Sequence, residues 1–547
     1  MRIFSVVLFL LLFVSCSSEY VDTSLNMSYA ENGSISIRKH DFEYEDGTRL
    51  TFRTTDKGVT CTWKDGDAIG VFPVFPESGT QARMEIHAED VYGDAHYAVF
   101  NGDGWMLDKN NSYAAYYPIN SNSASCDLYD EVEVDLDKTK QVGNKSLSHV
   151  EDMCLMYAPS TFAIENDDNG IEHCVAFDFH HVIAIMELHL IVPADAEWTR
   201  LMLTNKNSTN LFPWSAEMNV ATGELKYSEF WTVPYMSLEL QDVRSTSDCK
   251  ELVLYMPAYP VTTGELFARL ETSDGEFYDA SLPSKELQAG KVYRYYADME
   301  QKPVSGTENG YEWIDLGLGS GVKFAKVNIG AYSPDGAGKL YAWGETKAQG
   351  EVYETNLSNY KYSGTYVKTD YTWATYKFNN YSEEKEIALT KYCYDASYGY
   401  NGFVDNLFNI EMEDDAARVN MGGDWHVPSN DDFSELSSCC YWDWTDNYDN
   451  SGIAGYIIYR AKDKADRGKF SSKLINGYVV KSSPAASYSL NDAHIFIAGG
   501  QSFMTKEIYT NERIKADCRC FYVAQNEGWN LYWKQRTSPM CVRAVRF

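Results

Sequence analysis

Short runs of alternating apolar and polar residues fill the first half of the chain and restrict it to a β fold. The clearest run extends from Val175 to Val192, and its apolar residues change phase at His180 and His181. Because successive side chains of a strand point to opposite faces, this run indicates two strands with a bulge or a strand break between them. Strands at this spacing, with no helical pattern between them, favour β-sandwiches.

Two hairpins are predicted in the same half. Ala268 and Leu270 alternate with polar neighbours before the turn sequence Ser-Asp-Gly at residues 273–275, and the alternation resumes after that turn. The second turn sequence is Asn-Gly-Asp-Gly at residues 101–104. Glycine, asparagine and aspartate tolerate the backbone angles of tight turns, so both sequences predict pairs of antiparallel strands.

The first residues have the character of an export signal. Arg2 precedes an apolar stretch at residues 4–14, which is shorter than the roughly 20 residues needed to span a bilayer. Residues 13–16, FVSC, resemble a bacterial lipobox, although phenylalanine stands where leucine is usual. An ordinary secretory signal is the alternative.

The lipobox predicts how the protein is anchored. We expect residues 1–15 to be a signal peptide, Cys16 to carry the lipid and residues 16–29 to be a linker. The remainder would then lie outside the cytoplasm, held in the outer membrane or at the cell surface by its lipid.

Charge and motifs exclude several classes of function. The 547 residues include 47 basic and 79 acidic side chains, for a net charge of −32, which makes nucleic acid an unsuitable partner. The sequence contains no HExxH, G-x-S-x-G, Walker-type or dinucleotide-binding motif. We therefore expect no catalytic residues, no cofactor and no enzyme activity.

The cysteines suggest bridges and not a metal site. Of 12 cysteines, eleven remain after Cys16, so at least one stays unpaired within the chain. Cys439-Cys440 and the Cys-Arg-Cys sequence at 518–520 lack the paired CxxC spacing of zinc sites. No metal is predicted, whereas an exported protein can form disulfides.

Four strings in the first half carry a family resemblance. They are WKDGDAIGVF at 63–72, YAAYYP at 113–118, FDFHH at 177–181 and AGKVY at 289–293. In this order they resemble the fimbrillin-like proteins of Bacteroidota, which include surface pilins, pilus tips and related lipoproteins. The resemblance implies two transthyretin-like β-sandwich subdomains, at residues 30–150 and 151–303.

The second half resembles a different family. A linker is predicted at residues 304–310, where the composition changes. The strings that follow are YEWIDLGLGSGV at 311–322, VNIGA at 327–331, YAWGET at 341–346, DAARVNMGGDWHVPS at 415–429 and VRAV at 542–545. They resemble the Fibrobacter succinogenes major paralogous domain, which is similar to C-type lectin-like and formylglycine-generating-enzyme folds. An α+β domain over residues 311–547 is implied.

One amphipathic helix is clear from the residues themselves. Ser429 can cap a helix whose third position is Asp432, and apolar residues then recur at helical spacing. The glycine pair at 422–423 is predicted to end an earlier helix at residues 414–420.

Aromatic residues are the candidate ligand contacts of the second half, because aromatic rings stack on sugars and anchor protein interfaces. Core packing is the alternative for each of them. The candidates are Trp442, Trp444, Tyr448, Trp529 and Trp533.

The lectin-like resemblance also implies a disulfide. Such domains often tie their last strand to their first helix, so Cys541 is a candidate partner for Cys439 or Cys440. The helix carries Asn420 near the expected place, which leaves the partner open.

These features predict a surface lipoprotein that binds a glycan or a protein, with a pilus tip subunit as one form. Assembly by strand exchange, as in fimbrillin-like pilins, would begin with cleavage at Arg38, Arg49 or Arg53. The alternatives are a structural envelope lipoprotein and, remotely, a copper oxidase that would use the cysteines of residues 518–520.

Overall fold

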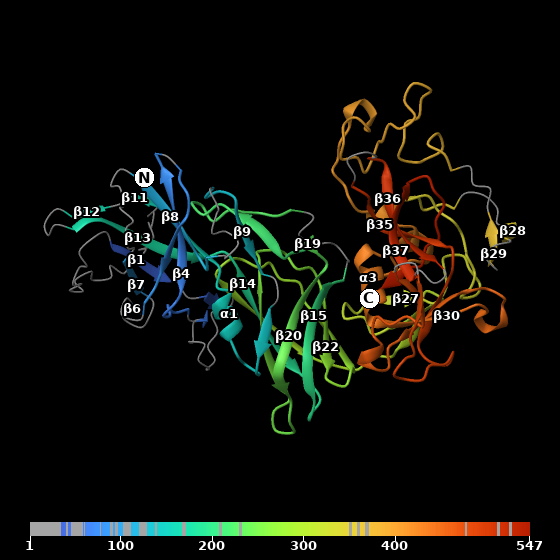
Figure 1. Cartoon of the computed structure of the whole chain (residues 1–547), viewed down its shortest axis with the longest axis horizontal. Coiled ribbons are helices and arrows are strands. Elements are labelled where there is room, and N and C mark those ends of the chain that lie inside the picture. Colours follow the sequence, from blue (N-terminus) through green and yellow to red (C-terminus); the bar gives the residue numbers. More distant parts are fainter. Residues whose placement is uncertain are drawn as a thin grey trace, which may run out of the picture.

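The computed structural model is an elongated molecule, with a large β-sheet at one end of its long axis and the C-terminal domain at the other (Figure 1). It describes residues 34–39, 42–44, 58–59, 61–76, 78–87, 91–92, 97–101, 111–119, 128–136, 139–162, 164–166, 171–206, 211–228, 232–348, 353–357, 362–366, 371–475, 478–510, 515–524 and 528–547. Within these residues, no helix has both the length and the apolar character needed to cross a membrane.

The first sheet forms the N-terminal unit. Its strands follow the order β5 (Ala82–Glu85), β4 (Ala68–Phe75), β8 (Ser112–Tyr117), β11 (Met156–Phe162), β13 (Ile171–His181), β1 (Ser34–Lys39), β7 (Tyr97–Asn101) and β6 (Val91–Tyr92), and β12 (Ile164–Asn166) pairs with β13. Strand β1 lies inside this order, parallel to β13 and antiparallel to β7. Its position makes the N-terminal strand a structural member of the sheet.

The second unit is a sandwich of two five-stranded sheets. One sheet has the order β10 (Lys140–Val142), β20 (Tyr235–Arg244), β15 (Glu197–Asn205), β22 (Leu266–Thr272) and β23 (Phe277–Leu282). The other has the order β21 (Glu251–Ala258), β14 (Ala184–Ile191), β24 (Lys291–Asp298), β2 (Phe42–Tyr44) and β3 (Gly58–Val59). Met186 and Leu188 of one sheet pack with Leu201 and Leu203 of the other in a common apolar core.

Smaller elements join these two units. They are a short helix, α1 (Ser148–Asp152), the pair β16 (Phe212–Pro213) and β19 (Thr232–Val233), and the sheet of β18 (Leu225–Lys226), β17 (Ser215–Met218) and β9 (Val132–Asp135).

The mainly β fold predicted from the sequence is confirmed. The strand break predicted at His180 and His181 is present, because β13 ends at His181 and β14 begins at Ala184. The hairpin at residues 273–275 is also present, with Leu270 of β22 opposite Tyr278 of β23. Strand β7 ends at Asn101, and the rest of the hairpin predicted there lies outside the described residues.

The subdomain boundary expected between residues 150 and 151 does not separate the sheets. Strands β11 and β13 lie after it but belong to the first sheet, whereas β10 lies before it but pairs with β20 of the second sandwich. The chain crosses between the two units several times, and alternation within a strand carries no information about which sheet receives that strand.

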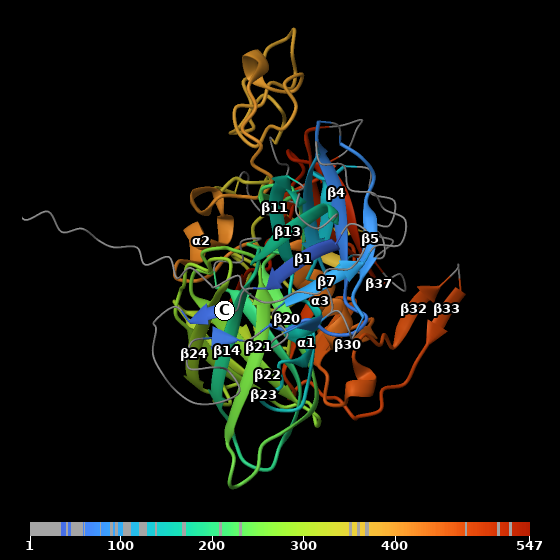
Figure 2. The same cartoon turned by 90° about the vertical axis from the view of Figure 1, so that its left-hand side faces the viewer.

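The C-terminal domain combines two helices with small antiparallel sheets. The helices are α2 (Ala416–Met421) and α3 (Asn430–Cys439). The sheets are β25 (Ser305–Glu308) with β26 (Tyr311–Ile314), β27 (Lys323–Ala325) and β38 (Val545–Arg546); β30 (Cys440–Thr445) with β31 (Gly455–Arg460) and β34 (His494–Ala498); and β35 (Ser502–Ile508) with β36 (Asp517–Ala524) and β37 (Gly528–Gln535). Two hairpins complete it, β28 (Tyr353–Leu357) with β29 (Tyr362–Tyr366) and β32 (Ser472–Ile475) with β33 (Tyr478–Lys481). Figure 2 shows β32 and β33 standing away from the body of the domain.

Both helix signals of the sequence are confirmed. The Ser429 hydroxyl accepts the Asp432 N–H at 3.1 Å while the Asp432 carboxylate accepts the Ser429 N–H at 2.6 Å, which completes a capping box on α3. Helix α2 ends at Met421, and its cap residue Gly422 has a φ of 72°, a positive value that glycine adopts at little cost.

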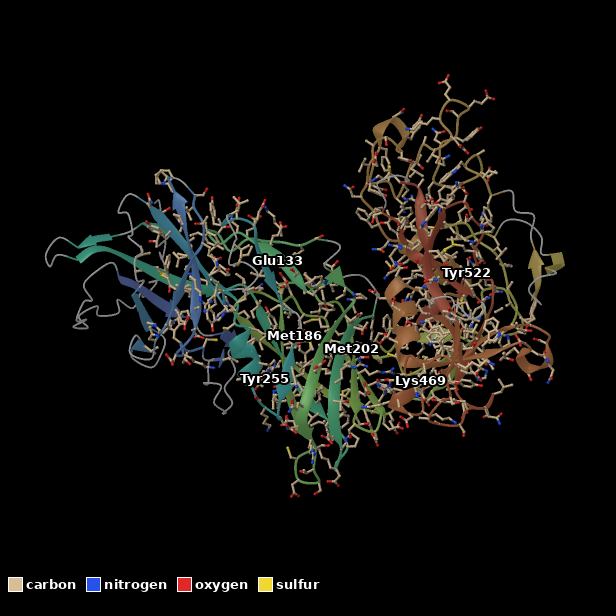
Figure 3. The ribbon with its side chains drawn as sticks, in the orientation of Figure 1. Glu133, Met186, Met202, Tyr255, Lys469 and Tyr522 are labelled. Atoms are coloured by element: carbon tan, nitrogen blue, oxygen red, sulfur yellow. The ribbon has the colours of Figure 1, made fainter. Side chains whose placement is uncertain are left out.

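The C-terminal domain covers the outer face of the β15 and β22 sheet. Met186 points into the sandwich core, whereas Met202 lies on the opposite face of its own sheet, on the side of the C-terminal domain (Figure 3). Arg269 of β22 is 2% exposed on this face and binds Asp279 of β23 and Asp315 of the C-terminal domain at 2.7 Å each. The second sandwich and the C-terminal domain therefore share a buried ionic interface.

Candidate binding surface

Strand β37 carries two exposed aromatic side chains of the C-terminal domain. It forms the edge of the described three-stranded sheet, next to β36. Tyr532 is 43% exposed and Trp533 is 49% exposed, although adjacent residues of a strand point to opposite faces. Both faces of the strand are therefore open at this point.

Trp533 belongs to a group of three side chains. The Tyr509 ring, just after β35, stacks on the Trp533 ring with 6.3 Å between centroids and 11° between planes. The Arg519 guanidinium lies 4.2 Å from the centroid of Tyr509. Arg519 is also the residue of β36 directly opposite Trp533, so the sheet register brings these groups together.

A second aromatic pair lies nearby. Tyr522 of β36 and Tyr532 of β37 meet edge to face, with 5.7 Å between ring centroids. Tyr522 is labelled on this sheet in Figure 3. This pair lies on the opposite face of the sheet from Trp533. We call Tyr509, Arg519 and Trp533, which lie together on the other face, the β37 surface.

The chemistry of the β37 surface suits binding rather than catalysis. A flat indole ring offers a large apolar area at a small entropic cost, and the guanidinium offers donors for a carboxylate or hydroxyl group. Stacking with Tyr509 holds both groups in place before a ligand arrives, which reduces the cost of ordering them.

Two of the other predicted aromatic contacts lie in the core. The Trp442 ring is fully buried, packs on Phe470 at 5.1 Å between centroids and donates its N–H to the Leu436 carbonyl at 3.3 Å. Tyr448 is buried and stacks on Phe496 at 4.1 Å. Both residues were expected to contact a ligand. Their burial corrects this expectation, because both rings pack in the core.

The remaining two candidates have different positions. Trp444 is half-buried on β30, where its indole N–H donates to the Asp446 carboxylate at 3.0 Å. Trp529 belongs to β37, but its side chain lies outside the described residues. The structure thus brings Trp533 together with Tyr509 and Arg519, places Trp442 and Trp444 on β30 of another sheet, and places Tyr448 in a 3-10 helix after β30.

The candidate bridge cysteines are separate thiols in this structure. Cys439, Cys440 and Cys541 are all free, and Cys440 and Cys541 lie in the same apolar core. The predicted bridge to Cys541 is not formed here. Burial raises the pKa of the Cys541 thiol to about 12, which favours the protonated form.

Cys518 and Cys520 share one buried face of β36 as the alternation predicts. Burial raises the pKa of Cys520 to about 11 and that of Cys518 well above its usual value. Copper is bound by thiolates, so this environment does not favour the remote alternative of a copper site.

An acidic cluster at η5 (Met412–Asp414) is neutralised by lysine. Lys391 donates to Glu413 at 3.0 Å and to Asp414 at 2.6 Å, and it also pairs with Glu411. Burial opposes ionisation of Asp414, but Lys377 and Lys391 outweigh it and lower the pKa of that carboxyl group. An ammonium group thus takes the place that a cation would need.

The anchoring residue predicted from the sequence, Cys16, lies outside the described residues.

Comparison with known proteins identifies the first half. The model of the fimbrillin-like family matches residues 48–310, a segment that contains most of the second sandwich and most of the first sheet. This region of the chain therefore matches the family that its four strings predict. No curated protein matches the chain.

Several solved structures are similar to the chain at low identity. A candidate cell adhesion protein from Bacteroides ovatus has 15% identity and a TM-score of 0.32, covering 49% of this chain and 93% of that one. The tip fimbrial protein Mfa3 from Porphyromonas gingivalis has 11% identity and a TM-score of 0.26, covering 50% and 95%. A fimbrial protein from Bacteroides ovatus has 12% identity and a TM-score of 0.24, covering 95% and 100%.

Sequence reasoning missed Tyr509 and its contact with Arg519. Arg519 was visible only as the residue between two cysteines, and the sequence around Tyr509 has no pattern of its own. The usable signal was the spacing of β36 and β37, because a short hairpin there would set Arg519 opposite Trp533.

Proposed function

We propose that the protein is a surface-anchored adhesion protein, associated with fimbriae, that binds a glycan or a protein through the β37 surface. The observation that carries this proposal is the exposed Trp533 ring, stacked on Tyr509 and flanked by Arg519. The fimbrillin-like front half supports a place at the cell surface. In this proposal Trp533 supplies the stacking plane and Arg519 supplies the polar contact.

We also propose that residues 311–547 form a C-type lectin-like domain of the Fibrobacter succinogenes major paralogous type. The strings quoted above support this, and so do the two helices and the small antiparallel sheets. Binding by such a domain needs no cofactor and no catalytic residue. Fold analogy alone is weak support for a sugar ligand, so the ligand class is left to the binding experiment.

Binding is tested by presenting the full chain to arrays of glycans and of proteins. We expect a hit whose affinity falls at least tenfold in Trp533→Ala and in Arg519→Ala, since a central aromatic or arginine anchor is worth roughly 2 kcal/mol or more. Tyr478→Ala is the matched control, because Tyr478 is 77% exposed on β33 in the same domain. Equal binding by all four proteins would contradict the proposal.

Anchoring is proposed to occur through a lipid on Cys16. Cys16→Ala should then move the protein from the membrane fraction to the soluble fraction, and retention of the variant in membranes would contradict the anchor. Protease treatment of intact cells separates an external adhesion protein, which is cleaved, from a structural lipoprotein that faces the periplasm.

The protein is further proposed to be an uncleaved monomer or a single terminal subunit of a fimbria. Strand β1 lies between β13 and β7, so its release would leave two unpaired strand edges for a donated strand. Arg38 is in β1, and Arg49 and Arg53 lie outside the described residues. The second sandwich leads directly into the C-terminal domain, which disfavours a repeating stalk subunit. Immunogold labelling along a whole filament would contradict this proposal.

A further inference from the structure

Two buried cysteines face each other at the junction of the first sheet and the second sandwich. The Sγ atoms of Cys61 and Cys154 are 3.1 Å apart, and Nδ1 of His181 lies 3.6 Å from Cys154 Sγ. The three side chains are 2%, 1% and 6% exposed. None of them takes part in the proposed binding surface.

Each of the three residues lies where the chain crosses between the two units. Cys61 follows β3 of the second sandwich and precedes β4 of the first sheet. Cys154 lies between α1 and β11, and His181 ends β13 just before β14. A backbone hydrogen bond of 3.1 Å from Val182 N–H to the Leu155 carbonyl holds two of these crossings together.

We propose that Cys61 and Cys154 form a disulfide in the exported protein and that this bond locks the junction between the first sheet and the second sandwich. The bond joins residues separated by 93 positions, so it closes a loop containing strands from β4 to β10. Such a bond keeps the crossings together when the non-covalent contacts around them open.

The reaction is a thiol–disulfide exchange with an oxidised dithiol protein of the exported compartment. The thiolate of one cysteine attacks the donor's disulfide, which forms a mixed disulfide and releases one donor thiolate. The second cysteine loses its proton and attacks the first sulfur, which forms the bond and releases the second donor thiolate. Two electrons and two protons pass to the donor, which becomes a dithiol.

The geometry favours a disulfide over a metal site. Two sulfurs bound at about 2.3 Å to one tetrahedral zinc ion would lie about 3.8 Å apart, which is farther than the 3.1 Å seen here. Only three candidate donors, Cys61, Cys154 and His181, gather at this point of the described structure. A closed structural zinc site needs four.

The proposal depends on export but not on ligand binding, so loss of the binding function would leave it standing. The first measurement is peptide mapping of the full chain from cells, alkylated under denaturing, non-reducing conditions. We expect a linked pair of peptides containing Cys61 and Cys154, while the exposed Cys249 carries the label. Alkylation of both Cys61 and Cys154, or their linkage to other cysteines, overturns the proposal.

A second measurement separates failure of export from failure of the bond. The purified full chain is equilibrated in glutathione redox buffers, where the link should form without any export step. Addition of dithiothreitol should lower its melting temperature, and the double variant Cys61→Ser, Cys154→Ser should show no such change. Cys249→Ser is the control that keeps the full response.

The metal alternative is resolved by His181→Gln. This variant should still form the linked peptide pair, because the bond needs only the two sulfurs. Zinc bound in proportion to the protein, with labelling of both cysteines only after a chelator is added, overturns the proposal in favour of a metal site.

Discussion

Replacing Arg269 by methionine tests the interface between the second sandwich and the C-terminal domain. All five N–H donors of the Arg269 guanidinium are used: two bind Asp279 at 2.7 Å each, two bind Asp315 at 2.7 and 3.3 Å, and one binds the Leu318 carbonyl at 2.6 Å. Burial disfavours the charge, but Asp315 and Asp279 outweigh it and raise the pKa of Arg269. The side chain is therefore charged and fully paired.

The expected cost follows from what Arg269→Met leaves behind. The variant buries two carboxylates and one carbonyl oxygen without their partner, and breaking a buried ion pair in this way costs about 3–5 kcal/mol. With a urea m value of about 3 kcal/mol/M, a loss of about 4 kcal/mol lowers the unfolding midpoint by roughly 1.3 M. We also expect the unfolding of the two domains to separate, because Asp315 and Leu318 belong to the C-terminal domain.

The assay is urea unfolding at pH 7, followed by tryptophan fluorescence and by proteolysis between Met299 and Ser305. Arg244→Met is the matched control, since the Arg244–Glu197 pair is exposed and worth about 0–1 kcal/mol. Neutralising the carboxylates as well, with Asp279→Asn and Asp315→Asn, should recover at least half of the loss. The reasoning is refuted if Arg269→Met costs no more than Arg244→Met.

The same interface has a defined pH dependence. Burial raises the pKa of Asp315, but Arg269 outweighs it and holds that pKa below its usual value. A carboxyl group with a lowered pKa stabilises the fold above its ordinary pKa of about 4, and this stabilisation is lost as the pH falls through the lowered value. The defect of Arg269→Met should therefore stay constant from pH 7 to about pH 4 and shrink as the pH falls below about 4, in urea titrations at each pH.

Three further variants test local features. His189 is half-buried between two carboxylates on β14 and β21; burial lowers its pKa, but the carboxylates outweigh this and raise it. A histidine whose pKa is raised on folding stabilises the fold fully below about pH 6.5, and this stabilisation is lost as the pH rises. His189→Gln should therefore lower the melting temperature more at pH 6 than at pH 8. Ser429→Ala removes the cap of α3 and should cost about 1 kcal/mol in urea unfolding, whereas Ser438→Ala, exposed near the end of the helix, should cost under about 0.5 kcal/mol. In Gly321→Ala the new methyl group would lie 1.8 Å from a phenylalanine ring of β22. Gly310 has a similar positive φ, but a methyl group there would meet open space. Gly321→Ala should therefore destabilise the protein by about 1–3 kcal/mol more than Gly310→Ala.

Local patterns predicted the elements of this fold well. The phase change at His180 and His181, the hairpin at residues 273–275 and the capping box at Ser429 each depend on a few neighbouring residues. They are present as predicted. The assignment of strands to sheets could not be predicted in this way, because β1 and β2 are close in sequence and yet belong to different sheets.

The binding surface was only partly predictable, for a similar reason. Trp442 and Trp533 are the same type of residue in similar local sequences, and burial separates them: one is enclosed by Tyr456 and Phe470, while the other lies on an edge strand. Exposure of a tryptophan depends on which elements cover its strand, and these come from distant parts of the chain. Aromatic content alone therefore predicts candidates but not the surface.

The charged side chains on the outer face of β22 and β23 have a consequence for folding. Arg269, Glu271 and Asp279 alternate with core residues, a pattern typical of a solvent-facing side, yet each is at most 4% exposed beneath the C-terminal domain. During synthesis the sandwich emerges before that domain and can fold first. A face of paired charges stays solvated in this interval, whereas an apolar face of the same size would be open to aggregation. Docking then buries the charges with new partners, because Asp315 binds Arg269 at 2.7 Å and Arg467 binds Glu271 at 2.7 Å. An ionic interface thus allows the front half to fold alone and still ties the β37 surface firmly to it.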